Sequence, residues 1–461
     1  MTFPPQVPGP AADLDLVGPW MTRQRWFANK GARPRLEEIG RWELAPEPGV
    51  RFVTHLLIDH AAGGATLYQV PLSYRDEPLV DVAPIGRRGL AWVYDAPRDN
   101  DYVAALLRML EHGSAASGAG ASALGERNPA SVPFDADSPS LHSRVLSGEQ
   151  SNTSIIVEWP GTGSIPVICK LFRALHHGEN PDVELQGALA AAGSTAVPRA
   201  VGAIVAEWPD SGRADGRARG HLAFAQEFLP GAADAWRLAL ESASAGEDFT
   251  EPARRLGVTT ATVHAMLARA LPTREATASD IAETLDQMRR RLDAALREVP
   301  ELEAHRAALE ETLALASASR WPEQQRIHGD LHLGQVLDVP GRGWFVVDFE
   351  GEPLRPMAER SQLDSPLRDV AGMLRSFDYV AGALGVTAGV DAREWARASR
   401  LAFAEGYGEA SGTNLAECRA VLDAFEADKA LYEAVYEVRN RPEWLAIPVA
   451  AIERISARVP G

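Results

Sequence analysis

The sequence predicts an α+β protein with two lobes, in which a strand-rich first half precedes a mainly helical second half. Residues 51–60 and 65–74 alternate apolar and polar side chains, as half-buried strands do. Residues 232–320 instead repeat apolar side chains every three to four positions, which is typical of amphipathic helices. Short apolar runs at 327–349 predict two strands that interrupt the helical half, and helical spacing then resumes to the end.

The chain length favours more than one folding unit. At 461 residues it exceeds what one simple core usually organises, since domains average about 150 residues. The apolar fraction of 46% and charged fraction of 24% are ordinary for a globular protein. We expect three parts: an N-terminal subdomain at 1–95, an intermediate subdomain at 96–228 and a helical lobe at 229–461.

The individual elements of the first half have separate signals. Residues 101–112 carry the spacing of an amphipathic helix. Residues 113–133 are small and polar, which predicts a surface loop or linker. Residues 142–173 predict two or three strands separated by turns.

Two further elements precede the long helical region. A helix is expected to begin at Pro181, because Asn180 is a favoured cap and proline suits the first helical position. A strand is expected at 221–231, ending at Gly231. Later in the chain, 326–332 is expected to be a strand running into a loop.

The charge balance excludes several classes of partner. The chain has 63 acidic and 46 basic residues, for a formal net charge of −17, so we expect no general affinity for nucleic acid or anionic membranes. Two cysteines indicate no disulfide framework. The first 20 residues lack a signal-peptide pattern, and no apolar run reaches 18 residues. These features predict a cytoplasmic protein.

A cluster of histidines and acids surrounds Asp330. If 326–332 is a strand, then His328, Asp330 and His332 alternate onto one face, which resembles metal-ligand spacing. A zinc site normally needs three or four nitrogen or sulfur ligands, however, and the other histidines form no second cluster. A zinc hydrolase is therefore disfavoured.

Magnesium-dependent phosphoryl transfer fits the cluster better. Asp348 and Gln335 offer the hard oxygen ligands that Mg²⁺ prefers. Asp330 is then free to accept the proton of an attacking hydroxyl, as this reaction requires. We expect His328 and His332 to support the site, and Glu350 to be a second-shell acid, a metal ligand or a loop anchor. A structural hydrogen-bond network is the alternative for each residue taken singly.

A nucleotide site is predicted upstream. Lys170 lies in an apolar, strand-like run, where an unpaired ammonium would be costly to bury, and Glu184 on the following helix is its expected partner. The polar run before this strand is expected to cover phosphate groups, and the link between the lobes is expected to face adenine. The residues concerned are Ser151, Asn152, Thr153, Ser154, Glu227 and Phe228.

Several motifs in order resemble the actinobacterial maltokinases. They include GEQSNTSIIVEW (148–159), HGDLHLGQ (328–335), DFEGEP (348–353) and DKALYEAVYEVRNRPEW (428–444). The resemblance runs from about residue 23 to the C-terminus, whereas GDxH alone marks only the wider aminoglycoside-phosphotransferase-like kinases.

The resemblance implies a bilobal protein-kinase-like fold with an N-terminal cap. It also implies that Mg²⁺ and ATP are used to phosphorylate the anomeric C1 hydroxyl of maltose, which gives maltose 1-phosphate for α-glucan (glycogen) synthesis. A maltose-producing enzyme such as trehalose synthase is a candidate partner.

The same resemblance directs attention to the C-terminal motif as the sugar site. On a helix, Lys429, Tyr432 and Tyr436 share a face and Glu437 lies beside them, which would combine aromatic stacking with fixed polar groups. A packed terminal helix is the structural alternative. Two other functions remain open: a kinase for another small acceptor, such as glucosamine or an aminoglycoside, and an inactive kinase-like binding subunit.

Overall fold

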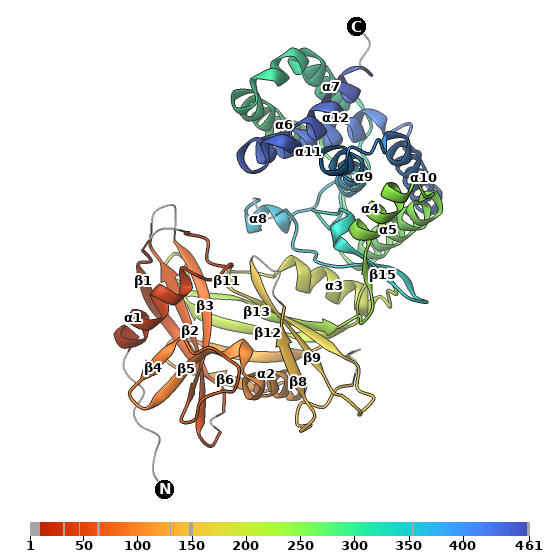
Figure 1. Cartoon of the computed structure of the whole chain (residues 1–461). Coiled ribbons are helices and arrows are strands. Elements are labelled where there is room, and N and C mark those ends of the chain that lie inside the picture. Colours follow the sequence, from red (N-terminus) through yellow and green to blue (C-terminus); the bar gives the residue numbers. More distant parts are fainter. Residues whose placement is uncertain are drawn as a thin grey trace. The chain divides into compact units, whose positions relative to one another are not determined.

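The computed structural model forms two compact units, Met1–Gly187 with Pro198–Pro230 and Ala188–Val197 with Gly231–Gly461. The predicted α+β class is confirmed, since strands dominate the first unit and helices the second (Figure 1). The structure describes residues 10–30, 33–45, 47–61, 65–129, 131, 133–146, 151–352 and 355–458.

The first unit is built on one long antiparallel sheet. Its strand order is β4-β5-β3-β2-β1-β6-β7-β12-β13-β10-β9-β8, and β11 pairs with β3. The strands are β1 (Leu36–Glu43), β2 (Val50–Asp59), β3 (Thr66–Arg75), β4 (Gly86–Arg88), β5 (Ala91–Asp95), β6 (Ala115–Ser117), β7 (Ser122–Arg127), β8 (His142–Val145), β9 (Asn152–Glu158), β10 (Val167–Phe172), β11 (Ala174–Leu175), β12 (Ala200–Pro209) and β13 (Arg217–Glu227). The helices α1 (Pro10–Met21) and α2 (Asn100–His112) belong to the same unit, and α3 (Pro181–Ala191) begins in it.

The expected loop at 113–133 is wrong, because this segment contributes β6 and β7 to the sheet. Its small residues permit close packing: a Cβ at Gly125 would lie 2.2 Å from the carbonyl oxygen of Met109 in α2, and one at Gly118 would lie 2.4 Å from that of Arg41 in β1. Glycine is therefore required where the backbones approach one another. The composition that indicated a linker instead reflects tight contact.

The second unit is helical around a three-stranded sheet. The helix α11 contacts α6, α7, α9 and α12, and α5 packs along α10 (Figure 1). The helices are α4 (Ala235–Ala245), α5 (Thr250–Ala270), α6 (Ala278–Glu298), α7 (Arg306–Ala318), α8 (Met357–Arg360), α9 (Leu367–Ala388), α10 (Arg393–Ser411), α11 (Arg419–Asn440) and α12 (Ala446–Ser456). The sheet has the order β14 (Ala233–Asp234), β15 (Val336–Val339) and β16 (Gly343–Val346).

The core of the second unit places α11 firmly. Ala427, Ala430, Leu431 and Ala434 of this helix are buried among apolar residues of α6, α7 and α12. Full burial of a leucine side chain contributes about 2 kcal/mol, so this face fixes the rotation of α11. Lys429 and Glu433 then point away from that cluster. Within the described part of the chain, every helix is too short or too polar to span a bilayer.

Candidate active site

The loop around Asp330 is anchored by a buried carboxylate. The prediction of a strand at 326–332 is wrong, since this segment runs as an irregular loop. Asp369 of α9 replaces the missing strand partner: its two oxygens accept the backbone N–H groups of His328 and Gly329, both at 2.8 Å. His264 also bonds to Asp369 at 3.0 Å. This anchoring role of Asp369 was not predicted from the sequence.

The imidazole of His328 joins two segments of the site. Its Nδ1 accepts the backbone N–H of Asp330 at 3.3 Å, so its Nε2 carries the proton and donates to the carbonyl oxygen of Val347 at 2.9 Å. The ring also packs on Phe349, with centroids 4.7 Å apart. His328 therefore holds the Asp330 loop against the segment that contains Asp348.

Gln335 and Asp348 meet through the hairpin of β15 and β16. Val336 pairs with Val346, which brings the residues flanking the hairpin together, and Gln335 Nε2 donates to Asp348 Oδ2 at 3.1 Å. Asp348 lies two residues beyond the end of β16 and has a φ of 66°. A non-glycine residue in this region costs about 1–3 kcal/mol and is found mostly at functional positions. The backbone thus holds this carboxylate in a strained but defined place.

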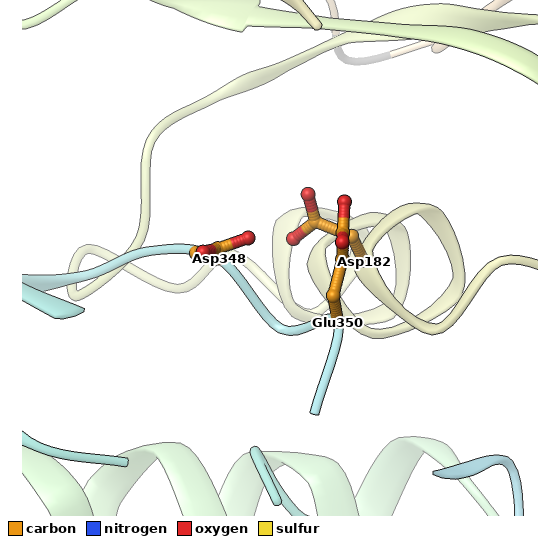
Figure 2. Close-up of side chains that lie close together, drawn as sticks. All are labelled: Asp182, Asp348 and Glu350. Atoms are coloured by element: carbon orange, nitrogen blue, oxygen red, sulfur yellow. The ribbon is translucent and has the colours of Figure 1, made fainter. Parts of the chain in front are cut away.

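The oxygens of this segment suit a divalent cation. Figure 2 shows Asp348 and Glu350 on the chain that follows β16; it also labels Asp182, which belongs to α3 of the first unit. One carboxylate oxygen of Asp348 lies within 4.8 Å of one from Glu350. Two carboxylates and the Gln335 amide provide the hard donors that Mg²⁺ prefers, so the donor set fits this metal.

The Lys429 ammonium lies between two carboxylates. Its Nζ bonds to Asp330 Oδ1 at 3.0 Å and to Glu352 Oε1 at 2.5 Å. Burial lowers the pKa of Lys429, but the charges of Glu352 and Asp330 outweigh this effect and raise the pKa well above its usual range. Lys429 is therefore a permanent cation beside the predicted base.

A pocket of about 550 Å³ opens beside Asp330 in the second unit. Its lining includes the predicted sugar residues and the half-buried His332. It also includes residues of β14, α4, α9 and α11 that were not selected from the sequence. Burial lowers the pKa of His332. The lining residues are Asp234, Trp236, Asp330, His332, Gly334, Glu352, Gly372, Ser376, Tyr379, Lys429, Tyr432, Glu433, Tyr436, Glu437 and Arg441.

The missed pocket residues had weak signals in the sequence. Asp234 caps α4, accepting the backbone N–H of Trp236 at 2.7 Å, and any acid before a helix resembles a cap. Glu433 stands one helical turn after Lys429, on the stripe of the helix that adjoins the predicted tyrosine face. Only the packing of α4 beside the Asp330 loop reveals that these residues share a pocket.

In the first unit, Lys170 of β10 pairs with Asp182 of α3 at 3.2 Å. Asp182 also accepts a hydrogen bond from Gln186 Nε2 at 2.7 Å, so the carboxylate is fixed by its own helix. Glu184 is the partner of Lys170 that the sequence predicted, and that contact stays a prediction. Asp182 was not predicted as a partner. The predicted start of this helix at Pro181 is confirmed.

The predicted phosphate cover lies at the start of β9. Ser151 precedes this strand and Asn152 begins it, whereas Thr153 and Ser154 are buried within it. The Thr153 hydroxyl accepts a hydrogen bond from Arg173 at 2.8 Å, which directs it into the protein. The residues 147–150 of this motif lie outside the described residues. Phosphate binding by this run stays a prediction.

The segment predicted to face adenine forms the end of β13. The backbone N–H of Glu227 donates to the carbonyl of Arg199 at 2.8 Å, and that of Phe228 donates to the carbonyl of Pro166 at 2.8 Å. The Glu227 carboxylate is buried against the Arg199 guanidinium at 3.0 Å. These donors serve the sheet, so any contact with adenine would use other backbone atoms.

Comparisons with known families agree with this arrangement. Residues 20–99 match the maltokinase N-terminal cap domain, and residues 142–421 match the phosphotransferase enzyme family. A glucosamine kinase of Streptacidiphilus jiangxiensis is 31% identical over 340 residues, covering 68% of this chain and 74% of that protein. A glucosamine kinase of Mycolicibacterium smegmatis is 35% identical over 136 residues, covering 27% of this chain and 33% of that protein.

Solved structures support the fold over nearly the whole chain. A glucosamine kinase in complex with glucosamine, ADP and inorganic phosphate aligns with a TM-score of 0.67 and 24% identity, covering 97% of this chain and 99% of that one. A further crystal form of a glucosamine kinase gives a TM-score of 0.68 over 93% of this chain and 94% of that one, also at 24% identity. At this identity the likeness establishes the fold.

Proposed function

Because this chain belongs to the phosphotransferase enzyme family, we propose that it transfers the γ-phosphoryl group of ATP to a hydroxyl of glucosamine. The observation that carries this acceptor is the acidic pocket beside Asp330. Five carboxylates line it against two bases, Lys429 and Arg441, and both bases are paired with carboxylates of the same pocket. An excess of acid favours an acceptor that carries a positive charge.

Glu433 is the carboxylate best placed to receive that charge. Both hydrogen bonds from Arg375 reach its Oε2, at 3.0 and 2.7 Å, and the structure records none to its Oε1 from any described residue. Burial raises the pKa of Glu433, which a bound ammonium would counteract. Glu433 stands one helical turn, about 6 Å, from Lys429. That spacing is comparable to the width of one pyranose ring. Because Lys429 is bonded to Asp330, one sugar could therefore contact Asp330 and Glu433 together.

The aromatic residues of the pocket suit the faces of a sugar ring. Tyr432 packs under Lys429, with the ammonium 5.1 Å from its ring centroid, and Tyr436 is 43% exposed and available for contact. Trp236 adds an indole at the start of α4. Aromatic rings and charged groups together would orient a small polar acceptor, as ligand pockets generally do.

The proposed reaction assigns one task to each residue at the hairpin. Mg²⁺, held by Asp348 and Gln335 with Glu350 beside them, would neutralise charge on the phosphate oxygens of the nucleotide. Asp330 accepts the proton of the attacking hydroxyl. His328 keeps the Asp330 loop in register with the Asp348 segment through its two hydrogen bonds. In the first unit, Lys170 is proposed to bind phosphate oxygens, with Asp182 holding its ammonium in place.

Maltose is the second candidate acceptor, with maltose 1-phosphate as its product. The match of residues 20–99 to the maltokinase cap domain favours it, as do the motifs of the C-terminal helix. A place in glycogen synthesis and association with a maltose-producing enzyme would follow from this candidate alone. A cytoplasmic location is proposed for either acceptor.

A panel of sugars separates the two acceptors. We expect ATP consumption with glucosamine to exceed that with maltose by at least tenfold in kcat/KM, measured by coupled ADP release. N-acetylglucosamine is the matched control, because acetylation removes the positive charge. Equal turnover with glucosamine and N-acetylglucosamine would contradict ammonium recognition, and preferred turnover of maltose would establish the second candidate.

Replacing Glu433 by glutamine tests the pocket directly. We expect the KM for glucosamine to rise about 10- to 100-fold, which corresponds to the loss of one charge-assisted hydrogen bond, while kcat changes little. Glu443→Gln is the control, since that acid is exposed outside the pocket lining. An unchanged KM for glucosamine in Glu433→Gln would remove this residue from acceptor binding.

A further inference from the structure

The use of lysine in this chain is unusually restricted. Of the 46 lysine and arginine residues, only Lys30, Lys170 and Lys429 are lysines. Lys30 is exposed and donates to the backbone of the cap segment, whereas the other two pair with buried or half-buried carboxylates. A chain that otherwise uses arginine therefore has a lysine ammonium at the predicted base.

The geometry at Lys429 explains that choice. The ammonium is a compact point charge with three donors, so it can bond to Asp330 and Glu352 in two different directions. A guanidinium is a larger group whose five donors lie in one plane. Side-chain exposures of 23% for Lys429, 17% for Asp330 and 16% for Glu352 leave little water to screen the three charges.

The neighbouring cations are engaged elsewhere. Arg291 bonds to Asp428 at 2.6 Å, and Arg368 bonds to Asp364 at 2.7 Å, although both arginines line the small cavity behind Lys429. Among the described residues, Lys429 is the cation that forms an ion pair with Asp330. It reaches this position from α11, 99 residues later in the chain.

The ion pair between Lys429 and Asp330 distinguishes the two carboxylate oxygens of this predicted base. Lys429 occupies Asp330 Oδ1, and Oδ2 accepts no hydrogen bond from any residue that the structure describes. The backbone N–H of Asp330 donates to His328, so the residue is held through both its backbone and its side chain. Oδ2 is thereby left to receive a proton.

We propose that Lys429 is a positioning residue for Asp330, and that Glu352 holds Lys429 in place for this purpose. The inference rests on the proposed phosphoryl transfer. In that step the acceptor oxygen forms a bond to the γ-phosphorus, the bond from this phosphorus to the bridging oxygen breaks, and ADP leaves. The hydroxyl proton passes to Oδ2 of Asp330, while Lys429 keeps Oδ1 occupied and the carboxylate in one orientation.

Steady-state kinetics distinguish this role from direct sugar binding. We expect Lys429→Met to lower kcat about 10- to 100-fold, the size of one charge-assisted hydrogen bond, with both KM values within about threefold of wild type. Lys429→Arg should recover part of kcat because it restores the charge, and Glu352→Gln should show a smaller loss than Lys429→Met. A loss confined to the KM of the acceptor would overturn the proposal and assign Lys429 to sugar binding.

Lysine labelling tests the contact without any substrate. The full chain is acetylated with a limiting reagent, and the reactivity of its three lysines is compared by mass spectrometry. We expect Lys429 to react slowly in the wild type and about tenfold faster in Glu352→Gln, as a change of one pKa unit would give, with Lys30 unchanged as the internal control. Equal Lys429 reactivity in the two proteins would show that Glu352 does not hold the ammonium.

The two measurements separate failure of this inference from failure of the proposed acceptor. Labelling reports the ion pairs whichever sugar is phosphorylated, and the kinetic ratios can be measured with whichever acceptor the sugar panel identifies. Inactivity of the wild type towards glucosamine would reject the acceptor only. Unchanged kcat in a folded Lys429→Met, with a melting temperature near that of the wild type, would reject the positioning role only.

Discussion

Replacing Asp330 by asparagine is expected to lower kcat by about 10²- to 10⁴-fold, the usual contribution of a general base. The amide keeps the size of the side chain and an oxygen for Lys429, but it cannot take up the proton of the acceptor hydroxyl. The KM for ATP should change little, because the proposed metal ligands remain. The measurement is ADP release at saturating acceptor.

The control for Asp330→Asn is Asp338→Asn, which makes the same chemical change in β15 without touching the pocket. This variant should keep kcat within about twofold of the wild type, because the half-buried Asp338 lies outside the pocket lining. If Asp330→Asn retained near-normal kcat on a folded protein, another group would have to accept the proton, and the assignment of the base would be wrong.

Replacing Asp348 by asparagine is expected to raise the Mg²⁺ concentration for half-maximal activity by at least about 100-fold. Loss of a residue that merely supports a metal ligand costs about 10- to 100-fold in affinity, and loss of a ligand charge should cost no less. Asparagine is suitable here because Asp348 has a φ of 66°, which asparagine tolerates better than most residues. Backbone strain should therefore stay the same.

The measurement for Asp348→Asn is activity against Mg²⁺ concentration at fixed ATP, together with Mn²⁺·ADP binding by electron paramagnetic resonance. Glu350→Gln is the informative comparison, because its effect decides among the three roles left open for Glu350. A strong effect on Mn²⁺ binding would make Glu350 a ligand, and a weak one would make it a support. Normal Mn²⁺·ADP binding in Asp348→Asn would contradict the proposed metal site.

Candidate site residues that lie close together in the sequence were the easiest to group from the sequence alone. Asp330, Gln335 and Asp348 span 19 positions, and one hairpin with its preceding loop brings Gln335 and Asp348 into contact. Short-range geometry of this kind depends on strand pairing and turn length, both of which leave signals in sequence. The secondary structure of the loop itself was misjudged at 326–332, because a side chain from α9 satisfies its backbone.

Contacts between distant elements depended on packing that no local pattern encodes. Lys429 was predicted to face a sugar, but its bonds to Asp330 and Glu352 follow from how the core rotates α11. Likewise, the rotation of α3 about its axis brings Asp182 into an ion pair with Lys170 of β10. Asp182 lies two positions before Glu184, the predicted partner.

The sequence alone predicted the fold class, the strand that carries Lys170 and the grouping of Gln335 with Asp348, since alternation, helical spacing and short motifs are local properties of a chain. Metal binding by these two residues stays a prediction. The tertiary structure decided which charges meet. Pairing between residues 99 positions apart is fixed only when buried apolar faces set the rotation of each helix, and that rotation directs Lys429 to Asp330, the predicted base, and Glu433 to the pocket.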